Sequence, residues 1–82
     1  MKNSENIDNE FFKENRIKIG IALREIREKN GYSQDYLAEI MDVNRSTISK
    51  IENGKFNCSI NYLSKFAWFL KFDFSLIVNE RE

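Results

Sequence analysis

The sequence lacks proline and histidine, and it contains one cysteine and three glycines among its 82 residues. Cys58 cannot form an internal disulfide, and a chain without histidine offers little material for a metal site. Histidine is also the commonest general base in enzymes, and the three glycines lie too far apart to form a phosphate-binding loop. We therefore expect no enzymatic activity, no cofactor and no metal, and we interpret Cys58 as a small residue in a connection between helices.

Long apolar segments are also missing. No run approaches the roughly 20 residues that span a bilayer. The first ten residues, MKNSENIDNE, lack the apolar stretch of a signal peptide, so we expect a cytoplasmic protein. With 41% hydrophobic and 32% charged residues, the composition is typical of one small soluble domain. A core of this size is marginally stable, so a second subunit would add stability.

A net charge is absent too, because 13 basic residues balance 13 acidic ones. The distribution is uneven, however. Residues 15–70 contain nine basic and six acidic residues, whereas the flanking segments 1–14 and 71–82 are acidic. A locally basic region can bind nucleic acid even in a neutral chain, so the zero net charge does not exclude that function.

Four segments show the periodicity of amphipathic helices, and capping residues mark their ends. The first helix is expected at 16–30, where Asn30-Gly31 is a favourable stop. Ser33, Asn44 and Ser59 are suited to cap helices at 34–41, 45–53 and 60–70. The expected core positions are Ile19, Ala22, Leu23, Ile26, Leu37, Ala38, Met41, Val43, Ile48, Ile51, Ile60, Leu63, Phe66, Ala67 and Leu70.

The second and third of these helices are joined by only three residues, 42–44, which is the arrangement of a helix-turn-helix. In the third helix, the positions outside the core fall on one face, and all of them carry hydrogen-bonding groups without an acid. These positions are Arg45, Ser46, Ser49, Lys50 and Asn53. Polar faces are common on solvated helices, but such faces usually mix both charges. With the turn and the spacing, this face predicts a DNA-binding helix.

The last segment, 72–78, changes to the two-residue period of a strand. A lone strand in a helical chain needs a partner, so we predict that it pairs with the same strand of a second copy. The alternatives are a short fifth helix or a frayed tail. The residues assigned to dimerisation are Trp68, Phe69, Phe72, Phe74, Leu76 and Val78. Two alternatives also stay open for residues 1–14, which form either a short helix docked through Ile7 and Phe11 or a disordered acidic arm.

The segment ALREIREKNGYSQDYLAEIMDVNRSTISKIENGK closely resembles the Xre family of lambda-repressor/Cro-like helix-turn-helix regulators. The resemblance covers roughly residues 16–70. It implies a compact bundle of about five helices whose second and third helices bind DNA. The chain is thus expected to be mainly α, with four to five helices and a short C-terminal β-strand paired across a dimer. Its expected parts are an N-terminal arm or short helix at 1–14, a DNA-binding domain at 15–70, and a dimerisation strand and tail at 71–82.

The resemblance also implies roles for individual residues. Base contacts are expected from Arg45, Ser46 and Lys50, with Ser49 as a further candidate. Gln34 matches the position that binds a phosphate and supports the recognition helix. Further contacts to the DNA backbone are expected from Asn44, Thr47, Asn53 and Lys55. Arg27 and Glu52 match a partly buried structural ion pair.

The sequence departs from the family pattern at two places. Asp42 stands where the family usually has a glycine, and Asp tolerates the left-handed conformation better than most residues do. The strand-like FDFSLIV replaces the fifth helix and resembles a subset that includes some antitoxins. The expected function is a homodimeric transcriptional regulator, a repressor or autorepressor, that binds an inverted-repeat operator in double-stranded DNA. The alternative is an antitoxin or phage-type regulator that also binds a toxin or other protein partner, through Tyr62, Phe66, Trp68, Phe69, Phe72 and Phe74.

Overall fold

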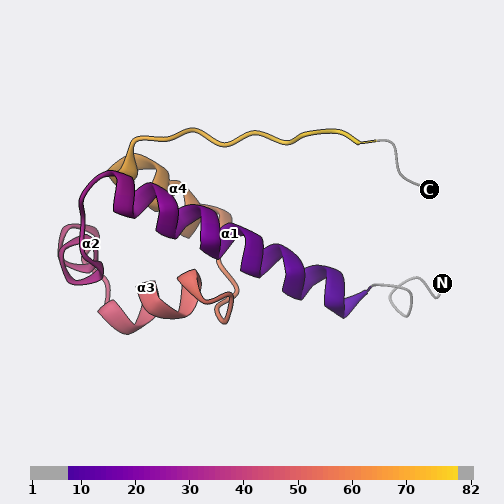
Figure 1. Ribbon diagram of the computed structural model, residues 1–82, viewed down its shortest axis with the longest axis horizontal. Coiled ribbons are helices and arrows are strands. Elements are labelled where there is room, and N and C mark those ends of the chain that lie inside the picture. Colours follow the sequence, from indigo (N-terminus) through magenta and orange to yellow (C-terminus); the bar gives the residue numbers. More distant parts are fainter. Residues whose placement is uncertain (1–7, 80–82) are drawn as a thin grey trace.

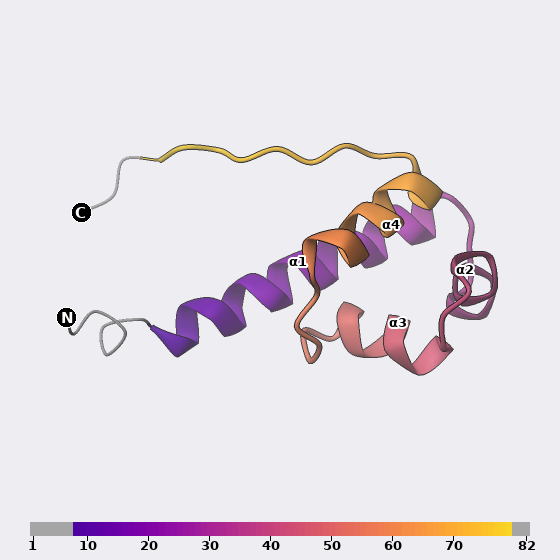
Figure 2. The same cartoon turned by 180° about the vertical axis from the view of Figure 1, so that it is seen from behind.

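The computed structural model describes residues 8–79, which contain four α-helices and no β-strand. The helices are α1 (Asn9–Lys29), α2 (Gln34–Met41), α3 (Arg45–Glu52) and α4 (Ile60–Leu70). α4 lies along the C-terminal half of α1, and α2 and α3 gather at one end of the molecule (Figures 1 and 2). The mainly helical fold is confirmed, and α2 and α4 have the predicted bounds.

α1 begins earlier than the predicted start at residue 16. The side chain of Asp8 caps the helix by accepting a hydrogen bond from the backbone N–H of Glu10 at 3.0 Å. The helix ends as predicted, because Gly31 adopts a left-handed φ of 75°. Residues 9–14 are therefore helical, whereas the part of the N-terminal prediction that concerns residues 1–7, Ile7 included, lies outside the described residues.

The core contains apolar side chains from all four helices. Burying one large side chain of this kind contributes about 1.5–3 kcal/mol. The buried apolar residues are Leu23, Leu37, Ala38, Met41, Ile48, Ile51, Phe66 and Leu70. Three expected core residues are instead exposed. Ile19 is 39% exposed, Ile60 is 67% exposed, and Ala22 is also exposed. The prediction was wrong for these three.

The error at Ile19 and Ala22 has its cause in Gly20. A Cβ atom on Gly20 would lie 2.5 Å from the carbonyl oxygen of Ile51, so α1 meets the end of α3 backbone to backbone. This close approach makes Gly20, Leu23 and Arg27 the buried stripe of α1. The stripe turns Ile19 and Ala22 away from the core. Ile60 is the first residue of α4, directly after the Ser59 cap, where the helix has only begun to enter the core.

α4 ends at Lys71, which adopts a left-handed backbone conformation with φ 61°. The backbone N–H of Phe72 then donates to the carbonyl of Ala67 at 3.1 Å. Beyond this turn the chain extends away from the helices, toward the end of the molecule at which α1 begins (Figures 1 and 2). Residues 72–79 form no strand with any other part of the described chain, so the predicted strand is not confirmed.

The first turns of α1 and residues 73–79 project from the rest of the molecule (Figures 1 and 2). The radius of gyration is 14.4 Å, compared with about 12 Å for a compact domain of this length. In the segment, Leu76 is 95% and Val78 is 94% exposed. In residues 8–79, no helix combines the length and apolar character needed to cross a membrane.

Candidate nucleic-acid interface

Local backbone geometry sets the angle between α2 and α3. The hydroxyl of Ser33 accepts a hydrogen bond from the N–H of Tyr36 at 3.0 Å and so fixes the start of α2. Asp42 ends that helix in the left-handed conformation, with φ 58°. The N–H of Val43 then bonds to the carbonyl of Ala38 at 3.0 Å. Asp42 thus adopts the conformation for which glycine is the usual choice.

α3 presents a polar face to solvent because Ile48 and Ile51 occupy the core. Arg45, Ser46 and Lys50 are exposed, and Thr47 and Ser49 are half-buried. Glu52, the acid of this helix, is only 6% exposed. The outward face of α3 consequently combines hydroxyl donors with two cations, as contacts to base edges require.

A buried network fixes the C-terminal end of α3 against α1. The guanidinium of Arg27 donates to both carboxylate oxygens of Glu52, from Nε at 2.6 Å and from Nη2 at 3.0 Å. Nη1 of Arg27 donates to the carbonyl of Tyr32 at 2.7 Å. The hydrogen bond with Glu52 raises the pKa of Arg27, against the opposing effect of burial. The pair is structural, since the side chain of Glu52 is only 2% exposed.

Gln34 joins this network from the start of α2. Its Nε2 donates to Oε1 of Glu52 at 2.9 Å, so one carboxylate connects α1, α2 and α3. The half-buried Gln34 therefore stabilises the position of α3. A bond from Gln34 to a DNA phosphate stays a prediction.

The residues expected to contact the DNA backbone surround α3. Asn44 begins the helix with an extended backbone, and its exposed side chain makes no capping hydrogen bond within the described chain. Asn53 donates from Nδ2 to the carbonyl of Ser49 at 2.9 Å. Lys55 is exposed just after α3, where its N–H bonds to the carbonyl of Lys50 at 2.8 Å. These side chains lie at both ends of the proposed recognition helix.

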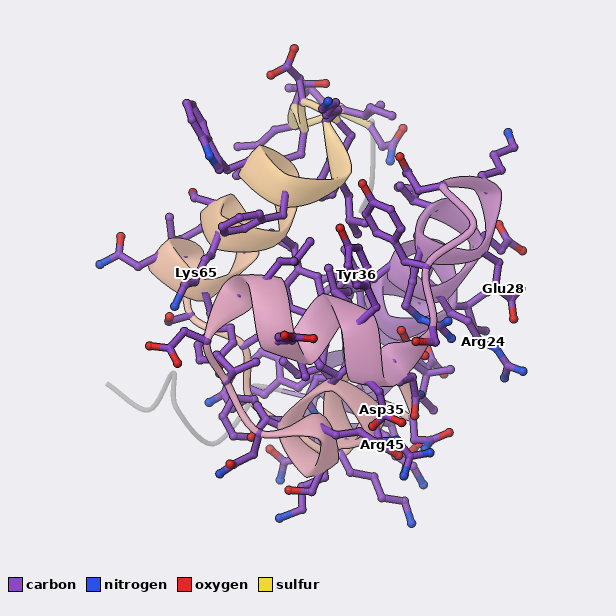
Figure 3. The ribbon with its side chains drawn as sticks, turned by 90° about the vertical axis from the view of Figure 1, so that its left-hand side faces the viewer. Arg24, Glu28, Asp35, Tyr36, Arg45 and Lys65 are labelled. Atoms are coloured by element: carbon purple, nitrogen blue, oxygen red, sulfur yellow. The ribbon has the colours of Figure 1, made fainter. Side chains whose placement is uncertain are left out.

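An acid that the sequence analysis did not single out lies next to this face. Asp35 of α2 forms an ion pair with Arg45 of α3, with 3.3 Å between Oδ1 and Nε. Figure 3 shows the two side chains close together, one from each helix. Both are open to solvent, with exposures of 80% for Asp35 and 62% for Arg45. The sequence gives only a weak signal for this pair, because the two residues meet across the turn.

The residues assigned to dimerisation divide into two groups. Phe69 and Phe72 are half-buried and pack against the core of their own chain. Trp68 is 79% exposed and Phe74 is 47% exposed. Leu76 and Val78 are almost completely exposed. Phe66, which the alternative hypothesis placed on a protein-binding surface, is fully buried, so that part of the hypothesis was wrong. Tyr62 is half-buried and packs edge to face with Phe56.

Cys58 lies in the connection between α3 and α4, where burial raises the pKa of its thiol. It lines a hollow of about 350 Å³ beside the first half of α1. The other residues that line this hollow are Phe12, Asn15, Arg16, Ile19, Ile51, Phe56 and Asn57. Among residues 8–79, no group of His, Cys, Asp or Glu is arranged to hold a metal ion.

Comparisons with known proteins agree with this geometry. A family model described as Helix-turn-helix matches residues 23–77. The fold is similar to the crystal structure of the restriction-modification controller protein C.AhdI from Aeromonas hydrophila. That likeness has 34% sequence identity and a TM-score of 0.69, and covers 72% of this chain and 89% of the other.

Two further solved structures show the same fold. One is a HipB–O2 20mer complex, with 25% identity and a TM-score of 0.68 over 79% of this chain and 90% of that one. The other is a protein described as MDT Protein, also with 25% identity and a TM-score of 0.68, over 79% of this chain and 92% of that one. No curated protein sequence matches the chain. The chain belongs to the helix-turn-helix family, as a DNA-binding transcriptional regulator of the Xre type.

Proposed function

We propose that the protein is a homodimeric repressor that binds an inverted-repeat operator and inserts α3 into the major groove. The observation that carries this proposal is the outward face of α3, which presents exposed cations and hydroxyls. On its other side, Glu52 of the same helix is hydrogen-bonded to Arg27 and Gln34, which fixes the position of α3. A helix fits the major groove, where the donor and acceptor pattern distinguishes all four base pairs. The likeness to a restriction-modification controller protein supports a regulatory role.

Base contacts come from one face of α3 and backbone contacts from its surroundings. We assign base contacts to Arg45, Ser46, Ser49 and Lys50. We assign backbone contacts to Gln34, Asn44, Thr47, Asn53 and Lys55. Arg45 is the principal determinant of specificity, because Arg can bond to both O6 and N7 of guanine. The DNA-binding unit is the domain at 15–70, although α1 continues across its N-terminal boundary.

Dimerisation through the segment at 71–82 accounts for the exposed apolar side chains of its described part. Leu76 and Val78 are almost completely exposed in one chain, and an antiparallel pair of segments would cover them and satisfy the extended backbone. A two-fold dimer of this kind would place two α3 helices in successive major grooves about 34 Å apart. An inverted-repeat operator is the corresponding DNA symmetry.

Selection of bound sequences from a random DNA pool tests the function directly. We expect a symmetric site with two half-sites, and sedimentation equilibrium should show a dimer at the concentrations that bind it. Arg45→Ala should relax the preference at one base position by about tenfold, whereas Lys55→Ala should weaken binding to all sequences alike and reduce its salt dependence. An asymmetric single site bound by a monomer would contradict the dimer, and an unchanged preference in Arg45→Ala would contradict the assigned face.

The exposure of Trp68, at 79%, favours a second candidate in which the regulator also binds a protein, as an antitoxin does. Aromatic side chains are enriched at protein interfaces. If the dimer leaves Trp68 uncovered, its indole fluorescence should shift only when that second protein binds. A shift on dimerisation alone would assign Trp68 to the dimer.

A further inference from the structure

We propose that Asp35 is a specificity-determining residue that positions Arg45 for its contact with guanine. The inference rests on the proposed function, in which Arg45 contacts a base. Asp35 itself touches no base in this proposal. It acts through the ion pair with Nε of Arg45, at 3.3 Å.

Both residues are held at fixed points of the helix-turn-helix. Asp35 is the second residue of α2, directly after the start that the Ser33 cap defines. Arg45 is the first residue of α3, directly after the turn that ends at Asn44. Because Gln34 also connects α2 to Glu52 of α3, a shift of the two helices would break this partly buried hydrogen bond. The separation of the two backbones at the ion pair is thus set by the fold.

The atoms used by the pair are compatible with a base contact. A bidentate bond to O6 and N7 of guanine uses two guanidinium nitrogens. The ion pair with Asp35 engages Nε, so the terminal nitrogens Nη1 and Nη2 can meet the guanine. An Arg side chain held in this way loses less conformational entropy when it binds than a freely rotating one does.

An acid at this place also has a cost. The carboxylate of Asp35 is 80% exposed beside a surface that must approach DNA phosphates, and like charges repel. Glu52, by comparison, is buried and paired with Arg27. Asp35 therefore weakens binding to any DNA while it orients the residue that selects one sequence. Together these two effects raise the ratio of specific to non-specific binding.

A purely structural role for Asp35 makes a different prediction. An acid in the first turn stabilises a helix through the helix dipole. In that case Asp35→Asn would lower the thermal stability of the protein and leave its base preference unchanged. The base preference is therefore the measurement that separates the two roles.

The test compares Asp35→Asn with the unaltered full-length protein on two duplexes, the selected site and the same site with the Arg45-dependent guanine replaced. Fluorescence anisotropy should show the guanine preference falling by about threefold to tenfold, with equal or higher affinity for an unrelated duplex. Glu14→Gln is the matched control, because it removes one exposed negative charge from the projecting half of α1. It should leave the preference unchanged.

A second substitution completes the test. In an Arg45→Ala background, Asp35→Asn should have no effect on the preference at that base, because the residue through which it acts is gone. A preference that stays within about twofold of the unaltered protein in Asp35→Asn would overturn the proposal. Failure of the proposed function looks different, since the unaltered protein would then show no preferred sequence, or Arg45→Ala would change none.

Discussion

The α2–α3 end of the molecule and its projecting end differ in the exposure of their apolar side chains. Around α2 and α3, large residues such as Leu37, Met41 and Ile48 have no exposed surface, and the charged Glu52 is satisfied by Arg27. At the projecting end, Phe12 is 46% and Leu76 is 95% exposed. The first region buries these aliphatic side chains within one chain and exposes only Tyr36 to a similar degree, at 47%, whereas the second region exposes Leu76, Ile77 and Val78 in succession. Neighbouring exposed apolar side chains of this kind often mark an interface.

The largest effect should come from the buried network of the first region. Arg27→Met would leave the carboxylate of Glu52 buried without its cation, and we expect a loss of about 3–5 kcal/mol in the free energy of unfolding. Urea denaturation measures this loss. Arg24→Met is the control, because Arg24 pairs with Glu28 while both side chains are more than half exposed. That change should cost about 0–1 kcal/mol. Equal losses in the two variants would contradict the structural importance of the buried pair.

The second effect concerns the close approach of α1 to α3. The sign of the change in the free energy of unfolding decides whether this approach exists. Helix propensity alone predicts that Gly20→Ala stabilises the protein by about 0.5–1 kcal/mol. The added methyl group would, however, lie 2.5 Å and 2.6 Å from the carbonyl oxygens of Ile51 and Glu52. We therefore expect a net loss of about 1–3 kcal/mol in the same urea experiment.

Ala22→Gly is a companion to this change on the exposed side of α1. It should cost up to about 1 kcal/mol through propensity alone. If Gly20→Ala raised the free energy of unfolding, α1 and α3 would not meet backbone to backbone.

The third effect tests whether the projecting segment lies in a dimer. If the segment pairs as a strand, Leu76 and Val78 lie on the same face as Phe72, whereas Ile77 lies on the other. Leu76→Lys should raise the dimer dissociation constant by at least about tenfold, since burial of a Leu is worth about 1.5–3 kcal/mol. Ile77→Lys is the matched control, because Ile77 is also 81% exposed in one chain. Sedimentation equilibrium that shows equal effects of the two changes would contradict strand pairing.

The smallest effect concerns Cys58, which lies between the two regions. Its pKa is raised in the folded protein from an ordinary value of 9.0 by burial. A raised pKa favours the neutral thiol in the native state, so this contribution to stability is complete below pH 9 and is lost as the pH rises further. Urea denaturation at about pH 8 and about pH 10 should show a small loss that is absent in Cys58→Ser. The same loss in both proteins would assign it to other groups.

The sequence predicts the helices well where a local signal controls them. Ser33 and Ser59 cap α2 and α4 with their own hydroxyls, so the starts of these helices need no information from elsewhere in the chain. Asp42 likewise ends α2 through its own backbone conformation. These features depend only on residues a few positions apart, so they can be read directly from the sequence.

What the sequence does not predict depends on residues that are distant along the chain. The rotation of α1 depends on Gly20 meeting the carbonyls of Ile51 and Glu52, which are thirty or more positions away. The pair of Asp35 with Arg45 depends on the angle between two helices. The strand predicted at 72–79 is not formed within one chain, and the pairing that we propose for it would need a second copy.

Lys71 lies between α4 and the 72–79 segment, and its backbone conformation would affect the spacing of the operator half-sites. Its left-handed φ of 61° fixes the direction in which the chain leaves α4, in a conformation that glycine adopts more easily. In the proposed dimer, that exit direction sets the distance between the two recognition helices. Lys71 would thus determine the number of base pairs between the half-sites of the operator without approaching the double helix.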